Sequence, residues 1–529
     1  MMYTSYIYLV LFLGITFFLY TIMPKKYKWA VLLTASYVFY IINARKYIIF
    51  LLSTTISIYI GGLILNKISD WYSSIKPSLS KEERKPKKKI MQREKKAVLA
   101  LIVLFNLGLL IFLKYYNFFS TSTNILLENM NANFTFPLSR FLLPLGISFY
   151  TLGALSYIID VYRGKYRGCK TFSKVALFMS FFPQIVEGPI GRFDLIADDL
   201  YEGHSFNYEN FSFGLKLIAW GLFKKLVIAD RANALVNTVF DAHKNYSGII
   251  VVIAILLYSL QLYTEFSGCM DIVRGSAKLF SVNLASNFER PFFSKSVSEF
   301  WRRWHITLGA WFRDYLFYSV SLSKGFLALN KWSKKHLNAF FGNLIPVSIA
   351  LFCVWFSTGL WHGASFKYIA YGLYYYVIMM IGMLFAPVSK KVLGILHLKE
   401  TNKAFAGFQI FRTFILVNLG MMIFRASSLT ASIEIFKSIF VNFSLSPIFN
   451  GTVLKLGIDK YDFLVLAISV VFLLIVNILE EKGHHIIEEL SSKNIVIRWS
   501  VYFAVIFAMI IFGAYGNGYG PVDFIYSQF

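Results

Sequence analysis

Long apolar runs constrain this chain more than any other feature of its sequence. A helix that crosses a bilayer needs about 20 consecutive apolar residues, and the run 6–23 is the first of several that approach this length. It is too long for the core of a signal peptide, and no small-x-small cleavage site follows it. Overall, 57% of the 529 residues are hydrophobic and 15% are charged, which is far too apolar for an ordinary soluble protein. We therefore expect an all-α, polytopic membrane protein.

The apolar runs continue to the end of the chain, and we expect residues 1–529 to form one membrane domain with about ten to twelve membrane elements. The expected spans are 6–23, 29–42, 47–65, 97–113, 142–159, 211–228, 249–263, 344–356, 368–385, 408–423, 463–479 and 496–512. The run 176–186 is short, contains Pro183 and ends at Glu187-Gly188-Pro189. Such a run is typical of a re-entrant element whose backbone is buried in protein or lines a cavity.

The positive charges predict the orientation of these spans. The formal net charge is +25, which we attribute to the Lys and Arg residues that membrane proteins keep in cytoplasmic loops rather than to nucleic-acid binding. The segment 67–96 is therefore expected to be a basic cytoplasmic loop, solvated and partly disordered, with binding to anionic lipids as an alternative. Its basic residues include Lys81, Arg84, Lys85, Lys87, Lys88, Lys89, Arg93, Lys95 and Lys96. The segment 120–134 carries no Lys or Arg and is expected to be an outer loop.

Two of the eight histidines lie next to aromatic residues at the edge of apolar runs. Read as one continuous helix from 300 to 316, the first motif places His305 in an aromatic stripe and Arg303 and Asp314 on the opposite side. Arg302 and Arg313 lie along one flank, where they could bind the phosphates of a donor or reach lipid headgroups. Ser296 and Glu299 could form a capping box at the start of this helix.

His362 lies between two glycines that permit a helix break and close backbone approach. An ionisable residue at membrane depth is a functional hypothesis by default, although a packing histidine bonded to a carbonyl is an equal alternative for each residue alone. An imidazole can take a proton from a hydroxyl at physiological pH. A glycan hydroxyl that attacks a thioester needs such a base and donors for the developing oxyanion.

Other kinds of site find little support in the sequence. It contains no G-x-S-x-G, P-loop or GxGxxG motif, and its three cysteines have no CxxC spacing. The pair His484-His485 lies in a charged loop without further ligands at zinc spacing. We therefore expect no bound metal or cofactor. Four further histidines are expected to be exposed loop residues: His204, His243, His336 and His397.

The chain resembles the membrane-bound O-acyltransferase family, in particular its bacterial branch that includes the alginate O-acetylation membrane protein. Two histidine motifs carry this resemblance, Phe300-Trp301-Arg302-Arg303-Trp304-His305-Ile306 and Leu360-Trp361-His362-Gly363-Ala364-Ser365. Shorter matches lie at 143–150, 160–164, 181–184, 187–190, 266–268 with Asp271, 287–292 and 424–426. They make 140–430 the family core. The chain departs from the family pattern at Glu187, and at 319–323, where Pro-Leu-Gly-Gly is usual.

The resemblance implies a ring of spans around a central tunnel, with His362 as the catalytic base and His305 as a second essential residue. It also implies donor or acceptor contacts from Trp301, Arg302, Arg303, Trp304, Arg313, Asp314, Trp361 and Gly363. The implied donor is a cytoplasmic thioester, acetyl-coenzyme A, and the acceptor is a polysaccharide or cell-wall glycan outside the plasma membrane of a bacterium. An extracytoplasmic SGNH-type acetyltransferase partner could relay the group. Two alternatives stay open: D-alanyl transfer to teichoic acid, and a transporter or flippase whose histidines relay protons.

Overall fold

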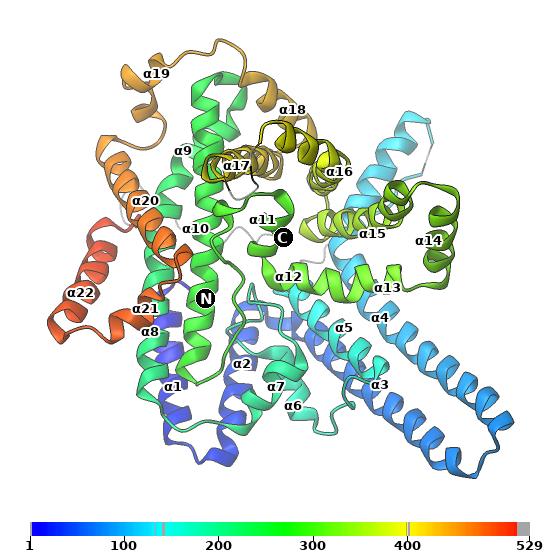
Figure 1. Cartoon of the computed structure of the whole chain (residues 1–529). Coiled ribbons are helices and arrows are strands. Elements are labelled where there is room, and N and C mark those ends of the chain that lie inside the picture. Colours follow the sequence, from blue (N-terminus) through cyan, green and yellow to red (C-terminus); the bar gives the residue numbers. More distant parts are fainter. Residues whose placement is uncertain (1–2, 133, 140–142, 398, 400–401, 516–529) are drawn as a thin grey trace. The chain divides into compact units, whose positions relative to one another are not determined.

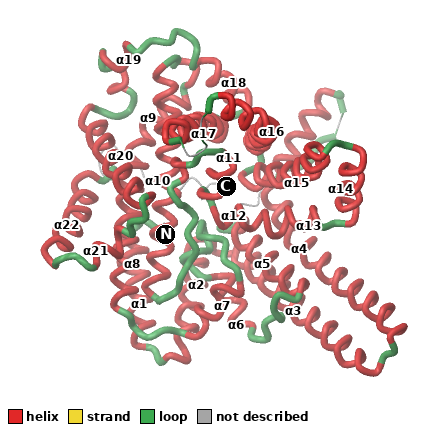
Figure 2. The backbone as a smooth tube through the Cα atoms, in the orientation of Figure 1, coloured by secondary structure: helices red, strands yellow, loops and turns green. Residues whose placement is uncertain are grey.

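The structure of the protein is a computed structural model that describes residues 3–132, 134–139, 143–397, 399 and 402–515. Every regular element in this part of the chain is a helix, apart from one isolated bridge between Phe288 and Trp304. Figure 2 shows helices connected by loops along these residues. The predicted all-α class is therefore confirmed.

The chain forms two compact units, residues 1–215 with 273–285 and residues 216–272 with 286–529. The principal helices of the first unit are α1 (Leu13–Ile22), α2 (Lys28–Ala44), α3 (Ile48–Ile75), α4 (Lys81–Asn129), α5 (Ile147–Arg163), α6 (Phe172–Ser180) and α7 (Phe193–Glu202). Two of the three unit boundaries fall within α8 (Tyr208–Leu222) and α10 (Ile249–Leu279), and the third falls in the loop between Ala285 and Ser286.

The second unit holds both histidine motifs, one at α11 and α12 and one at the end of α15, helices that Figure 1 labels. Its helices are the π-helix η5 (Phe223–Ala229), α9 (Asp230–Asp241), α11 (Val297–Arg303), α12 (Ile306–Trp311), the π-helix η8 (Phe312–Phe317), α13 (Tyr318–Ser321), α14 (Lys324–His336), α15 (Ala339–His362), α16 (Phe366–Ile395), α17 (Lys403–Arg425), α18 (Leu429–Ser438), α19 (Ser446–Phe449), α20 (Lys460–Glu481), α21 (Ile486–Ser491) and α22 (Ile495–Phe512).

Eight helical segments of the described residues are long and apolar enough to cross a membrane. They are Lys25–Ser78, which contains both α2 and α3, and the helices α4, α10, α15, α16, α17, α20 and α22. The apolar helix Ile7–Ile22 is shorter, and α5, predicted as 142–159, has 17 residues; Leu142 lies outside the described residues. The prediction of a polytopic membrane protein is confirmed.

The predicted cytoplasmic loop 67–96 is helical except for a turn, so the expectation of a partly disordered loop is wrong. Residues 67–75 end α3, and α4 begins at Lys81. A capping box defines this start: the Ser80 side chain accepts a hydrogen bond from the Glu83 backbone N–H, and the Glu83 carboxylate accepts one from Ser80 N–H. The following Lys, Arg, Glu, Gln and Met residues are good helix formers. Charge density alone therefore misled the prediction.

Helix α4 also continues through most of the predicted outer loop, to Asn129. Its polar side chains hold the segment that returns along it. The Asn124 side chain accepts a hydrogen bond from the Phe136 N–H and donates one to the Phe136 carbonyl. The Asn117 side chain forms the same pair of hydrogen bonds with the backbone of Ser139. Asn133 lies outside the described residues. The Ser, Thr and Asn residues of this segment predicted a loop. Some of them instead belong to α4 and bind the returning segment through their side chains.

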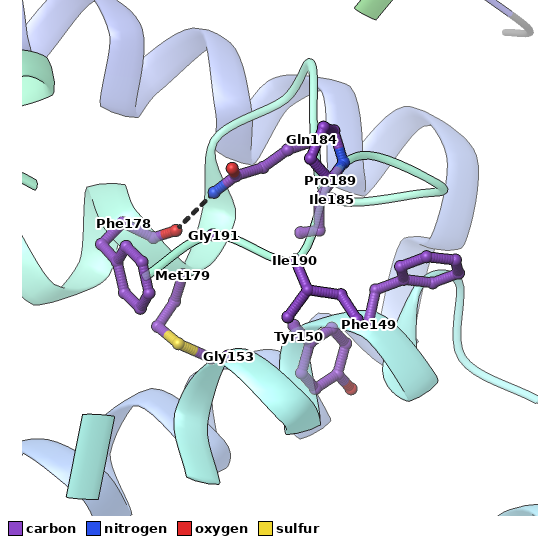
Figure 3. A pocket seen from close by; sticks show the side chains of 10 residues that line it. All are labelled: Phe149, Tyr150, Gly153, Phe178, Met179, Gln184, Ile185, Pro189, Ile190 and Gly191. Carbon is purple, nitrogen blue, oxygen red and sulfur yellow. Dashed lines mark hydrogen bonds between the residues drawn. The ribbon is translucent and has the colours of Figure 1, made fainter. Parts of the chain in front are cut away.

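The run 176–186 is largely buried and lines a small cavity (Figure 3), as expected for its backbone. That it is a re-entrant membrane element stays a prediction. Helix α6 ends at Ser180, and the turn that follows is buried. The Gln184 side chain donates a hydrogen bond to the Phe178 carbonyl at 3.1 Å, as Figure 3 shows. A Cβ added at Gly188 would lie 2.2 Å from Gln184 Cα, so only glycine fits this turn. The rest of the cavity wall comes from α5 and from 189–191.

Two of the lysines that interrupt the run 211–228 are buried on the π-helix η5 and neutralised by carboxylates. Lys224 Nζ lies 2.6 Å from Asp271, on α10. Lys225 Nζ lies 2.7 Å from Asp230 and 3.4 Å from Glu265. A buried charge is tolerated when it is paired in this way, so η5, α9 and α10 are held together by internal ion pairs.

Candidate active site

His305 lies at a break between two short helices, so the predicted continuous helix 300–316 is wrong. Helix α11 ends at Arg303, α12 starts at Ile306, and His305 between them has φ 48° and ψ 50°, in the left-handed region. Bonds to a distant strand-like segment cause the break. Glu289 N–H donates to the Arg303 carbonyl at 2.9 Å, and Ile306 N–H donates to the Asn287 carbonyl at 3.1 Å. These bonds replace those of a continuous helix.

The Asn287 side chain holds the His305 turn from the other side. Its Oδ1 accepts hydrogen bonds from Thr307 N–H at 3.0 Å and from Thr307 Oγ1 at 2.7 Å, and its Nδ2 contacts Met270 Sδ at 3.1 Å. Asn287 is 1% exposed. A residue of this type, buried and bonded on both ends, fixes the backbone of its neighbour. The sequence placed Asn287 among the family matches but gave it no role.

The His305 ring is 2% exposed and lies among aromatic edges. The Phe266 ring centroid is 4.9 Å away and the Trp361 centroid is 5.7 Å away, both in edge-to-face geometry. The aromatic setting was predicted, but these rings come from α10 and α15 rather than from His305's own helix. Trp301, predicted beside His305, packs at 5.0 Å from Trp355 and 4.8 Å from Tyr375.

His362 is the last residue of α15 and is 3% exposed. Its ring lies 5.6 Å from that of Tyr371 on α16 and 5.2 Å from that of Phe424 on α17, with interplanar angles of 89° to both. Both glycines beside it are tightly packed. A Cβ at Gly359 would lie 2.4 Å from the Tyr368 carbonyl oxygen, and one at Gly363 would lie 2.4 Å from the Tyr368 ring.

The close approach of backbones predicted at these glycines is confirmed, and it occurs between α15 and α16. A Cβ on Gly372 of α16 would lie 2.2 Å from the Trp355 carbonyl oxygen of α15. At Gly359 and Gly372 no side chain separates the two helices. This contact fixes the end of α15, where His362 lies, against the tyrosines of α16.

One indole joins the two histidines. The Trp361 ring centroid lies 5.7 Å from that of His305 and 5.1 Å from that of His362, edge-to-face in both cases. The two imidazoles are therefore no farther apart than these two distances placed end to end. Residues 57 positions apart in the sequence belong to one aromatic cluster, as the prediction of a shared site requires; the catalytic roles of His305 and His362 stay predictions.

The three arginines predicted to contact donor or acceptor differ in their surroundings: one is bound by carboxylates and two are exposed. Arg303 lies 2.8 Å from Glu299 and 3.0 Å from Glu481 on α20, so two carboxylates already bind its guanidinium. Arg302 is exposed, and Arg313 pairs with Asp314 at 2.9 Å while 61% of its side chain is exposed. Arg302 and Arg313 are exposed to solvent and could meet an anion or lipid headgroups, Arg313 with Asp314 already beside it, whereas Arg303 is bound by two carboxylates and anchors α11. Their part in donor binding stays a prediction.

The start of α11 and the neighbouring Trp304 complete this region. The Ser296 side chain accepts from Glu299 N–H at 3.1 Å, as the predicted capping box requires. The Glu299 carboxylate, however, accepts from Lys295 N–H at 2.9 Å instead of Ser296 N–H, because it also reaches Arg303. Trp304 stacks on Phe300 at 5.4 Å and is 2% exposed, so it packs at the break next to His305. Its predicted contact with donor or acceptor stays a prediction.

Comparison with known proteins identifies the family of the chain. No known family profile matches the chain. It is 31% identical over 471 residues to the "probable alginate O-acetylase AlgI" of Pseudomonas aeruginosa, covering 88% of this chain and 81% of the relative. It is 29% identical over 372 residues to the peptidoglycan O-acetyltransferase of Helicobacter pylori, covering 65% and 64%. It is 30% identical over 254 residues to the teichoic acid D-alanyltransferase of Bacillus subtilis, covering 47% and 60%. The chain belongs to the membrane-bound O-acyltransferase family.

Proposed function

We propose that this multi-pass membrane O-acyltransferase uses a cytoplasmic thioester, acetyl-coenzyme A, to O-acetylate a polysaccharide or cell-wall glycan outside the plasma membrane of a bacterium. The acetyl group reaches the glycan directly or through an extracytoplasmic SGNH-type acetyltransferase. One observation carries this proposal: two buried imidazoles, His305 and His362, lie edge-on to the same Trp361 indole within the family's two histidine motifs.

The chemistry follows from an imidazole in a water-poor, aromatic setting. The hydroxyl oxygen of the acceptor attacks the thioester carbonyl carbon while His362 takes the hydroxyl proton. Collapse of the tetrahedral intermediate then breaks the carbon–sulfur bond, and the imidazolium returns the proton to the leaving thiolate. The products are an O-acetyl ester and a free thiol. His305, held in its turn by Asn287, positions donor or acceptor in this scheme.

Acetyl transfer is favoured over D-alanyl transfer by the extent of the alignments. The O-acetylase and O-acetyltransferase relatives align with 88% and 65% of this chain, whereas the D-alanyltransferase of Bacillus subtilis aligns with 47%. D-alanyl transfer is the second candidate, because that alignment still reaches 30% identity. The two functions differ in the donor that the enzyme accepts.

Inverted membrane vesicles that contain the protein and its acceptor provide the test. Radiolabelled acetyl-coenzyme A is added to the exposed cytoplasmic face, and label is counted in glycan and in protein. We expect His362→Ala and His305→Ala each to reduce transfer by roughly 100-fold or more. His485→Ala, at an exposed histidine, serves as the matched control and should keep full transfer.

Each other outcome contradicts a defined part of the proposal. Full transfer by His362→Ala would refute the catalytic base. Label transferred from a D-alanyl thioester but not from acetyl-coenzyme A would replace acetylation by D-alanylation. Histidine-dependent passage of a substrate across the vesicle membrane without any acylated product would indicate a transporter.

A further inference from the structure

The first third of α4, residues 81–96, is a basic helical rod. Nine Lys and Arg residues lie between Lys81 and Lys96, and every residue from 81 to 90 is exposed. At 100° per residue, seven of the nine fall within roughly 140° of the helix circumference. We call this set the basic face: Lys81, Arg84, Lys85, Lys88, Lys89, Lys95 and Lys96. Glu83 and Glu94 lie on the opposite side.

The basic face has a fixed geometry, unlike a charged loop. Its helix starts at the Ser80–Glu83 capping box and continues without interruption into the apolar part of α4. Figure 1 shows α3 and α4 running side by side as a hairpin, whose turn extends beyond α5, α6 and α7 of the same unit. The charges therefore keep a constant spacing, and an ordered surface of this kind can select a partner.

Distance from the bilayer separates the possible partners. The apolar part of α4 starts at Ala97. With a rise of 1.5 Å per residue, Lys89 lies roughly 12 Å and Lys81 roughly 24 Å before this point along the helix. Lipid headgroups occupy only about 5–8 Å beyond the hydrocarbon on each side, and their potential decays within about 8 Å at physiological salt. Headgroups can therefore reach Lys95 and Lys96, and their potential extends to about Lys88 and Lys89. Lys81, Arg84 and Lys85 lie roughly 18–24 Å before Ala97, beyond both the headgroups and their potential.

We propose that the outer part of the basic face, from Lys81 to Lys89, docks an acidic soluble protein in the cytoplasm, one that presents carboxylates along roughly 12 Å of its surface. The inference depends on the orientation predicted from the positive charges and is independent of acyl transfer. Single-stranded nucleic acid fits less well, because the sequence from 81 to 96 contains no aromatic residue on which a base could stack. Charge complementarity with carboxylates accounts for the exposed lysines at positions that lipid does not reach.

The test uses the full chain in nanodiscs of neutral lipid and a labelled 16-residue helical peptide with glutamates on one face. The main variant carries Lys81→Gln, Lys85→Gln, Lys88→Gln and Lys89→Gln. The control variant makes the same change of charge at four exposed lysines of α14: Lys324, Lys331, Lys334 and Lys335. We expect the main variant to weaken peptide binding by roughly tenfold or more and the control by less than about twofold, with binding that decreases as salt rises.

Three results would overturn the proposal. Equal losses in both variants would mean that the peptide responds only to net charge. Tighter binding of a DNA duplex of equal charge, with the same dependence on the basic face, would make the partner a nucleic acid. A fluorophore at position 88 that is quenched by spin-labelled anionic headgroups would show that the rod lies on the membrane instead of projecting from it.

Discussion

Removing the Asn287 side chain tests whether this residue holds His305 in its left-handed turn. In Asn287→Ala, the buried Thr307 N–H and hydroxyl lose an acceptor at 3.0 Å and 2.7 Å. A buried polar group that loses its partner costs about 1–3 kcal/mol, so the folded state should lose about 2–6 kcal/mol. The His305 backbone, a non-glycine residue with φ 48°, should then relax, and a displacement of about 1 Å is expected to reduce transfer by roughly 100-fold.

The assay combines the thermal unfolding midpoint in detergent with acetyl transfer in vesicles. Asn287→Asp keeps the acceptor oxygen and should restore much of the activity. Thr307→Val removes only the hydroxyl donor, so its loss of stability should be smaller than that of Asn287→Ala. Asn287→Ala with an unchanged unfolding midpoint and full transfer would refute the reasoning, since the turn would then hold without this side chain.

Three further changes test other contacts. Gly372→Ala should destabilise the protein by about 1–3 kcal/mol through overpacking against a backbone oxygen, while Gly382→Ala on the same helix, where an added Cβ meets no described atom within 4 Å, should be neutral in the same thermal assay. Lys225→Met leaves two buried carboxylates without their lysine and should cost about 3–5 kcal/mol, so an unchanged unfolding midpoint would contradict that ion-pair assignment. In intact cells, a cysteine at Lys88 should be protected from an impermeant thiol reagent and one at Asn131 should react; the reverse pattern would invert the predicted orientation.

The sequence predicted the helical class and the two histidine motifs well, because both depend on local signals. Apolar runs of bilayer length lie where the structure has helices, and the glycines beside His362 mark the close contact between α15 and α16. The break at His305 could not be predicted in this way. It depends on bonds to Asn287 and Glu289, which lie 14 to 20 residues before the residues they bind. Helical periodicity carries no information about such partners.

The prediction for the basic segment 67–96 failed for the opposite reason. A local signal for a helix was present in the sequence, but the charge density was given more weight. Ser80 and Glu83 form a recognisable capping box, yet the density of Lys and Arg suggested a disordered loop. The charge pattern was also insufficient to interpret Lys224 and Lys225. Both lysines interrupt an apolar run, and their counter-charges on α10, Asp271 and Glu265, lie 47 and 40 residues later. Composition shows that a charge is present, but only the folded chain shows whether a carboxylate lies beside it.

The contact of α15 with α16 at Gly359 and Gly372 has a consequence for how the enzyme tolerates different membranes. Two spans that touch backbone to backbone have little freedom to slide, so a thinner or thicker bilayer is accommodated by tilting them as a pair. The rings that α15 and α16 place around His362 then tilt together with it. Activity should accordingly vary little among lipids of different chain length as long as this contact is intact, and should become sensitive to chain length in Gly372→Ala.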